Sequence, residues 1–101
     1  MGEISVSEIL DDLRVAEEVL RKFERRYWIT SEQFYNLYNQ GVLDNGEHAE
    51  AFSEWAGFYK LKLRREESFR KIGQNRLDHM KALAQTGTIR LDPQEPVVEA
   101  V

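Results

Sequence analysis

The sequence of 101 residues contains no cysteine, only two prolines and no long uninterrupted apolar run. The lack of cysteine excludes a disulfide framework, a thiolate zinc site, a cysteine-ligated iron–sulfur cluster and a cysteine nucleophile. No run approaches the roughly 20 apolar residues that a membrane-spanning helix needs, and the acidic first residues lack the apolar segment of a secretory signal. We therefore expect a cytoplasmic protein that does not bind membranes.

The sequence also lacks the residue patterns that carry catalysis or cofactor binding. His48 and His79 are the only imidazoles, and neither a zinc-protease motif nor a glycine-rich phosphate loop is present. Glu47, Glu50 and Glu54 surround His48, but acidic residues are favoured in a first helical turn whether or not a metal is bound. We therefore expect no enzyme, no catalytic residue, no cofactor and no metal site.

Apolar residues recur with helical spacing over the first quarter of the chain. They are separated alternately by three and four residues, which is the seam of a heptad pattern. The seam consists of Val6, Ile9, Leu13, Ala16, Leu20, Phe23 and Tyr27. Ser5 and Glu8 have the spacing of a capping box at the start of this seam. The pattern predicts a helix over residues 6–27.

Two further helices follow from similar signals. Thr30 and Gln33 repeat the capping box, and Gly41 is a natural helix terminator, which predicts a short helix over 31–40. A third helix is expected over 47–85, capped by Asp44 or Asn45. Its expected apolar stripe consists of Phe52, Trp55, Ala56, Tyr59, Leu63, Phe69, Ile72, Leu77, Met80 and Leu83. Gly73 is a candidate break, because glycine costs about 1 kcal/mol relative to alanine inside a helix.

These elements predict an all-α fold with one helical domain over residues 1–85. The length fits a single domain. In this fold the long first helix packs antiparallel on the long third helix, as a helical hairpin, and the short second helix closes one end. Pro93 and Pro96 prevent a continuing helix, so residues 86–101 are expected to form an extended or flexible tail. The heptad seam favours a homodimer or a subunit of a hetero-complex.

Aromatic residues are concentrated in the middle of the chain, with ten of the eleven between residues 23 and 59. Two helical layers make a thin core, and adjacent rings such as Phe34 with Tyr35 cannot all face it. Some rings should therefore contact a partner protein, where tyrosine and tryptophan are enriched. The expected partner-binding residues are Trp28, Phe34, Tyr35, Tyr38, Trp55, Phe58 and Tyr59.

Charge is distributed unevenly along the chain. Residues 1–59 carry five basic and twelve acidic side chains, whereas residues 60–81 carry eight basic and three acidic ones. The expected contacts with phosphate groups or an acidic partner are Lys60, Lys62, Arg64, Arg65, Arg70 and Lys71. Nucleic-acid binding by this basic segment is therefore an alternative function, although a solvated helix face is the interpretation that we favour.

Three segments carry a resemblance to a known family. They are Arg-Arg-Tyr-Trp-Ile-Thr-Ser-Glu-Gln-Phe-Tyr-Asn-Leu-Tyr at 25–38, Gly-x-Leu at 41–43 and Phe-Ser-Glu-Trp-Ala-Gly-Phe-Tyr at 52–59. The stretch that contains them, about half of the chain, resembles small helical antitoxins of prokaryotic toxin–antitoxin pairs, of the kind that partner TumE-type toxins. The basic segment after Leu63 and the proline-containing tail depart from that pattern.

The resemblance implies a protein that neutralises a cognate toxin by direct binding, with autoregulation of the operon. Together with the aromatic surplus it predicts a protein-binding module, an antitoxin-like inhibitor. The alternatives are a nucleic-acid-binding regulator that uses residues 60–81, and a structural adaptor subunit.

Overall fold

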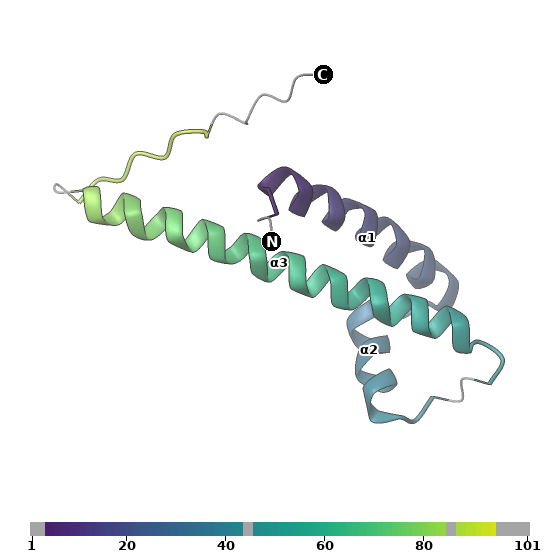
Figure 1. Cartoon of the computed structure of the whole chain (residues 1–101). Coiled ribbons are helices and arrows are strands. Elements are labelled where there is room, and N and C mark those ends of the chain that lie inside the picture. Colours follow the sequence, from purple (N-terminus) through teal and green to yellow (C-terminus); the bar gives the residue numbers. More distant parts are fainter. Residues whose placement is uncertain (1–3, 44–45, 85–86, 95–101) are drawn as a thin grey trace, which may run out of the picture. The chain divides into compact units, whose positions relative to one another are not determined.

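The protein is all-helical in the part of the chain that the computed structural model describes, which comprises residues 4–43, 46–84 and 87–94. Its helices are α1 (Val6–Tyr27), α2 (Ser31–Gln40) and α3 (Ala49–Leu83) (Figure 1). The predicted all-α class is therefore confirmed. The bounds of α1 and α2 are the ones that the capping and periodicity signals predict.

Both predicted capping boxes are present. The Ser5 hydroxyl accepts a hydrogen bond from the Glu8 N–H at 3.1 Å, and the Glu8 carboxylate accepts one from the Ser5 N–H at 3.0 Å. Thr30 and Gln33 exchange the same two bonds at 3.0 and 2.9 Å. Each box satisfies backbone donors that a helix start leaves unpaired. Gly41 ends α2 with a φ of 70°, a region that glycine adopts without steric cost.

Helix α3 is shorter than the predicted 47–85. The hydrogen bond from the Phe52 N–H to the His48 carbonyl is 2.9 Å long, which puts His48 at the cap position and leaves Glu47 in a turn. The candidate caps Asp44 and Asn45, and the predicted last residue Gln85, lie outside the described residues. Gly73 lies inside α3, which continues as α-helix on both sides of it, so the secondary structure shows no break there.

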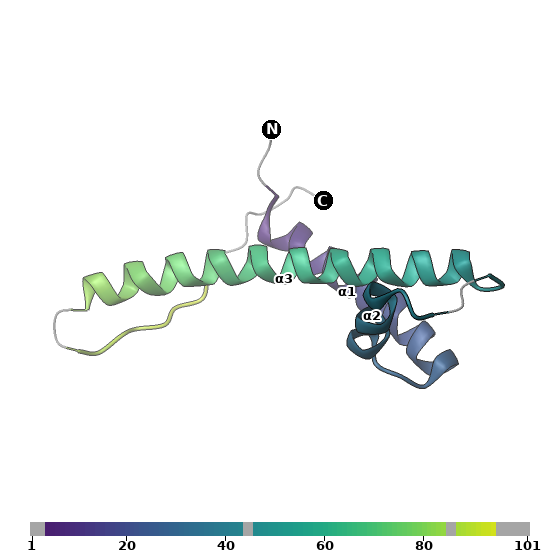
Figure 2. The same ribbon diagram turned by 90° about the horizontal axis from the view of Figure 1, so that it is seen from below.

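The chain divides into two compact units, unit 1 (Met1–Lys71) and unit 2 (Ile72–Val101). In unit 1, α1 and α2 both lie against the first part of α3 (Figures 1 and 2). Contacts between α1 and α3 include Asp12 with Arg65, Phe23 with Trp55, and Tyr27 with Phe52. The residue number rises along α1 while it falls along α3, so this pair is antiparallel, as predicted.

The core of unit 1 is centred on Trp55. Its ring stacks on Phe34 of α2 with centroids 3.9 Å apart and planes within 2° of each other, and on Phe23 of α1 at 5.2 Å. One side chain therefore packs all three helices together. The buried hydrophobic residues are Ile9, Ala16, Leu20, Phe34, Phe52, Trp55, Ala56 and Tyr59. Those on α1 belong to the predicted heptad seam.

Unit 2 is built differently, from the last part of α3 and residues 87–94, which contain neither helix nor strand. The Arg76 guanidinium donates a hydrogen bond to the Asp92 carbonyl oxygen, and Arg90 pairs with the Asp92 carboxylate at 2.9 Å. The described residues of unit 2 include no buried side chain. Among the described residues, the hydrogen bond from Arg76 therefore links residues 87–94 to α3, and no hydrophobic core supports it.

Candidate functional site

Three of the predicted partner-binding aromatics lie in the chain's own core. Phe34, Trp55 and Tyr59 are buried among residues of all three helices. Burial of large rings stabilises the fold directly. These three rings were expected to contact a partner, but they pack inside the chain's own core. A partner protein does not reach them unless unit 1 opens.

Three more predicted aromatics form the edge of this core. Tyr35, Tyr38 and Phe58 are partly buried and pack against it. The Tyr35 ring lies 5.0 Å from the ring of Tyr59, and the Tyr38 ring lies 5.5 Å from that of Phe34. Each of the three keeps part of its surface in solvent. A partner protein can therefore touch these rings, but only over the part that the core leaves exposed.

Trp28 is the predicted partner-binding aromatic that the fold leaves exposed. It follows the last turn of α1, its side chain is 88% exposed, and its backbone has a φ of 63°. The left-handed region costs a non-glycine residue about 1–2 kcal/mol, and glycine or asparagine usually occupies this position at a helix end. A large apolar ring is thus held in water by a strained backbone, which is typical of functional positions.

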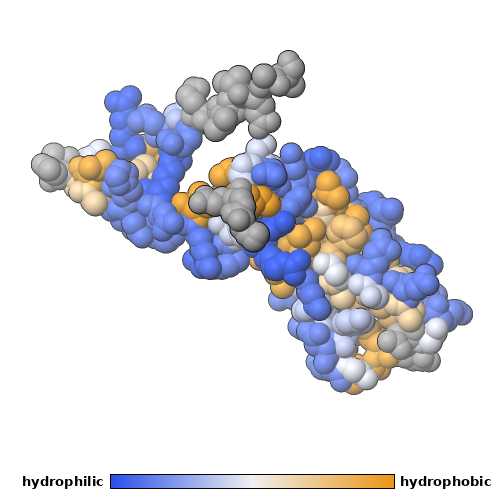
Figure 3. Space-filling view, in the orientation of Figure 1, coloured by the Kyte–Doolittle hydropathy of each residue, from blue (hydrophilic) through white to orange (hydrophobic). Residues whose placement is uncertain are grey.

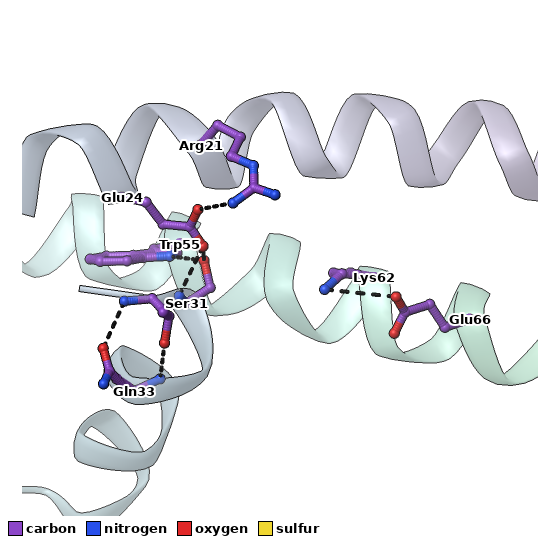
Figure 4. A network of polar contacts seen from close by, with 8 residues as sticks. Arg21, Glu24, Ser31, Gln33, Trp55, Lys62 and Glu66 are labelled. Carbon is purple, nitrogen blue, oxygen red and sulfur yellow. Dashed lines mark hydrogen bonds and ion pairs between the residues drawn. The ribbon is translucent and has the colours of Figure 1, made fainter. Parts of the chain in front are cut away.

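A polar network joins the three helices beside the core (Figure 4). The Ser31 hydroxyl and N–H both donate to the Glu24 carboxylate, at 2.8 and 3.0 Å. The Trp55 indole N–H donates to the Ser31 hydroxyl at 2.8 Å, and Arg21 donates to Glu24 at 2.8 Å. No sequence pattern predicted this network, because capping rules link residues three apart and these partners are seven and 24 residues apart.

The network lowers the pKa of Glu24. Partial burial by itself raises the pKa of this carboxyl, but the hydrogen bonds from Ser31 and Arg21 outweigh that effect and favour the ionised form. A shallow groove opens next to the network, lined among others by Glu17, Glu32 and Lys62. Lys62 pairs with Glu66 within α3 at 3.7 Å, whereas the bonds of Ser31 to Glu24 and of Trp55 to Ser31 connect different helices.

Three of the six predicted basic contact residues pair with acidic side chains of the chain itself, and the other three are exposed to solvent. Lys62, Arg65 and Arg70 have acidic partners within the chain: Glu66, Asp12 and Glu67 respectively. Of these pairs, the one between Arg65 and Asp12 joins α3 to α1. The other three predicted contacts, Lys60, Arg64 and Lys71, are exposed and have no ion pair in the described part of the chain. Their spacing of four and seven residues puts them on one face of α3.

Helix α3 carries apolar side chains that the structure leaves uncovered from Leu63 to its end. Leu63, Phe69, Ile72, Leu77 and Leu83 are exposed, as are Ile89 and Leu91 in the tail and Val6, Leu10 and Val15 on α1. Hydrophobic residues reach the surface over α1 and at the end of α3 (Figure 3). The pattern predicted the α3 residues as one stripe of a core. With 22 residues, α1 is about 33 Å long, whereas α3 with 35 is about 52 Å long, so α1 is too short to cover the whole of α3.

Comparison with known proteins assigns no family, since no family model, no curated protein and no solved structure matches the chain. Within the described residues, no helix combines the length and apolar character needed to cross a bilayer. The same residues contain no group of three or more metal-ligating side chains that could hold a metal ion. The argument for function therefore rests on the surfaces described above.

Proposed function

We propose that this chain is a protein-binding module, an antitoxin-like inhibitor that neutralises a cognate toxin by direct binding. The observation that carries the proposal is the apolar surface of unit 2, where Ile72, Leu77, Leu83, Ile89 and Leu91 are exposed and no described residue is buried. Covering apolar surface yields about 25 cal/mol per Å². A partner protein that covers these side chains would gain affinity from them and would order this part of the chain.

The charge distribution supports a protein partner over a nucleic acid. The chain has a net charge of −4, and half of the predicted phosphate contacts are engaged by its own carboxylates. The three remaining residues, Lys60, Arg64 and Lys71, form a narrow stripe. Such a stripe favours encounter with an acidic protein surface and speeds association. A nucleic-acid-binding regulator, in contrast, needs many more phosphate contacts for affinity at physiological salt.

The antitoxin part of the proposal rests on the resemblance of residues 25–38, 41–43 and 52–59. In the structure these residues include the turn between α1 and α2 and most of the aromatic core. Among them, Trp28 supplies an exposed ring of the kind that dominates binding energy at interfaces. A second copy of the chain is the competing candidate for the apolar surface, and light scattering of the purified protein tests for it directly.

Co-expression tests the proposed function. The protein encoded by the neighbouring reading frame is expressed alone and together with this chain. We expect growth arrest when the neighbour is expressed alone, normal growth when both are expressed, and co-purification of the two proteins. A neighbour that is harmless alone and does not co-purify with the chain rejects the proposal, and co-purification without toxicity supports the structural adaptor in its place.

A further inference from the structure

Helix α3 contains the same three-residue pattern twice, eleven residues apart. Leu61, Arg65 and Phe69 belong to unit 1, and Ile72, Arg76 and Met80 repeat their types in unit 2. Eleven residues make about three turns of an α-helix. Each residue of the second set therefore occupies the same register on α3 as its counterpart in the first set.

The first set lies on the face of α3 that binds α1. The Arg65 guanidinium donates a 2.7 Å hydrogen bond to the Asp12 carboxylate, and both Leu61 and Arg65 are partly buried. Asp12 stands beside the buried seam residues Ile9 and Ala16. In the first set, Arg65 is therefore bound by an amphipathic helix that carries a carboxylate next to its apolar face, while Phe69 remains 41% exposed.

In the second set, Arg76 and Met80 are partly buried as well, but the set has no carboxylate partner of this kind among the described residues. Ile72 is 37% exposed, and Leu83, which continues the repeat, is 67% exposed. Arg76 donates to the backbone carbonyl of Asp92, but no carboxylate in the described residues pairs with it, because that of Asp92 pairs with Arg90. A guanidinium has five N–H donors and binds a carboxylate best through two of them, so Arg76 retains unused binding capacity.

We infer that Ile72, Arg76, Met80 and Leu83 form the docking site for an amphipathic helix of the partner protein. The apolar side chains of that helix cover Ile72, Met80 and Leu83, and one of its carboxylates binds Arg76 as Asp12 binds Arg65. The inference rests on the proposed function, since it names the element through which the partner protein binds. Residues 72–84 carry two basic side chains, Arg76 and Lys81, against one carboxylate, that of Asp78, which favours a helix that presents an acidic residue to Arg76.

Two occupants from within this protein fit the site less well. The α1 helix of a second copy carries the matching carboxylate, but its apolar seam is already buried, with Ile9 and Ala16 inaccessible. Residues 87–94 contain no helix and leave Ile72 and Leu83 exposed. A helix from a different protein is therefore the occupant to which the site is complementary.

The test compares two charge reversals on α3 in the complex with the neighbouring gene's protein. Arg76→Glu places a carboxylate in the docking site, while Lys81→Glu makes the same change of charge five residues later, about 140° round the helix. We expect the dissociation constant to rise at least about tenfold for Arg76→Glu, the low end for a hydrogen-bonded interfacial charge pair, and less than about threefold for Lys81→Glu. Circular dichroism is expected to show equal helicity for both variants, since Arg76 contributes to no core.

A second arm identifies the partner helix. Hydrogen exchange of the complex locates the partner segment that becomes protected, and reversal of its acidic residue to lysine is expected to restore binding by Arg76→Glu. If the unaltered chain forms no complex, both the proposed function and the docking site are rejected. If the unaltered chain binds and both charge reversals bind equally well or equally badly, only the docking site is overturned. A protected partner segment without an acidic residue overturns it as well.

Discussion

The indole N–H of Trp55 donates a hydrogen bond of 2.8 Å to the hydroxyl of Ser31. That hydroxyl in turn donates to the Glu24 carboxylate, so a chain of two hydrogen bonds joins α3, the start of α2 and the last turn of α1. The same Trp55 ring stacks on Phe23 and Phe34. Polar and apolar contacts thus converge on one residue, which sets the arrangement of the three helices in unit 1.

Removing the Ser31 hydroxyl is expected to destabilise unit 1. Ser31→Ala leaves the Trp55 N–H and part of the Glu24 carboxylate without their partner, and unsatisfied buried groups cost about 1–3 kcal/mol each. We expect the free energy of unfolding in urea to fall by about 2–3 kcal/mol, given those costs. Ser53→Ala, at an exposed position of α3, is the matched control, expected to change stability by less than about 0.5 kcal/mol. Equal effects of the two substitutions would contradict the role of the network.

The lowered pKa of Glu24 predicts a pH-dependent contribution to stability. Because the folded pKa lies below the ordinary value of 4.5, the contribution is complete above that value and is lost as the pH falls through the folded pKa. Glu24→Gln removes the charge. The difference in unfolding free energy between the natural chain and this variant should therefore be largest near neutral pH and shrink below about pH 4.5. Urea titrations across that range measure it, and a constant difference would argue against the assigned hydrogen bonds.

The backbone of Trp28 predicts a substitution that raises stability. Trp28→Gly removes the left-handed penalty of about 1–2 kcal/mol, and little packing is lost because the ring is exposed. We expect the melting temperature to rise by several degrees, since about 1 kcal/mol shifts it by 4–8 °C in a domain of this size. Trp28→Ala keeps the penalty and serves as the control. If both variants bind the partner protein more weakly, the Trp28 ring contributes to binding. A lower melting temperature for Trp28→Gly would contradict the claim that the Trp28 backbone is strained.

The hydroxyl of Tyr27 is buried and has no hydrogen-bond partner in the described part of the chain. Its ring packs against Trp55 and Phe52. Tyr27→Phe keeps that packing and removes the unsatisfied oxygen, so stability should rise by about 1 kcal/mol or stay unchanged. Thermal melts measure the effect, with Tyr38→Phe at the core edge as the control. A loss of more than about 1 kcal/mol for Tyr27→Phe would mean that the hydroxyl does have a partner.

The parts of the fold that the sequence predicted are those specified by local chemistry. The capping pairs Ser5 with Glu8 and Thr30 with Gln33 act over three residues, so the starts of α1 and α2 follow from the sequence alone. Gly41 likewise ends α2 through its own backbone preference. The start of α3 was misplaced by two residues, because the acidic residue Glu47 suits a turn as well as a first helical turn.

The candidate sites depended on information that local patterns do not contain. Periodicity showed that Ile72 and Leu83 share apolar character with the core residues of α3, but the same periodicity is produced by a core and by a docking face. What distinguishes the two cases is burial in the folded chain: Trp55 is fully buried, whereas Ile72 and Leu83 are exposed. In the same way, no pattern indicates that Trp28 takes a left-handed conformation, since that position usually selects glycine.

Hydrogen exchange of residues 74–84, in the chain alone and in the complex, tests most directly the claim that unit 2 is a surface for a partner protein. Because the described residues of unit 2 have no buried side chain, we expect fast exchange in the chain alone, compared with the slow exchange of α1 around Ala16 and Leu20. In the complex with the neighbouring gene's protein, exchange in residues 74–84 should slow at least about tenfold, because the bound partner protects the helix from opening. Slow exchange of these residues in the free chain, or exchange that the complex leaves unchanged, would contradict the account.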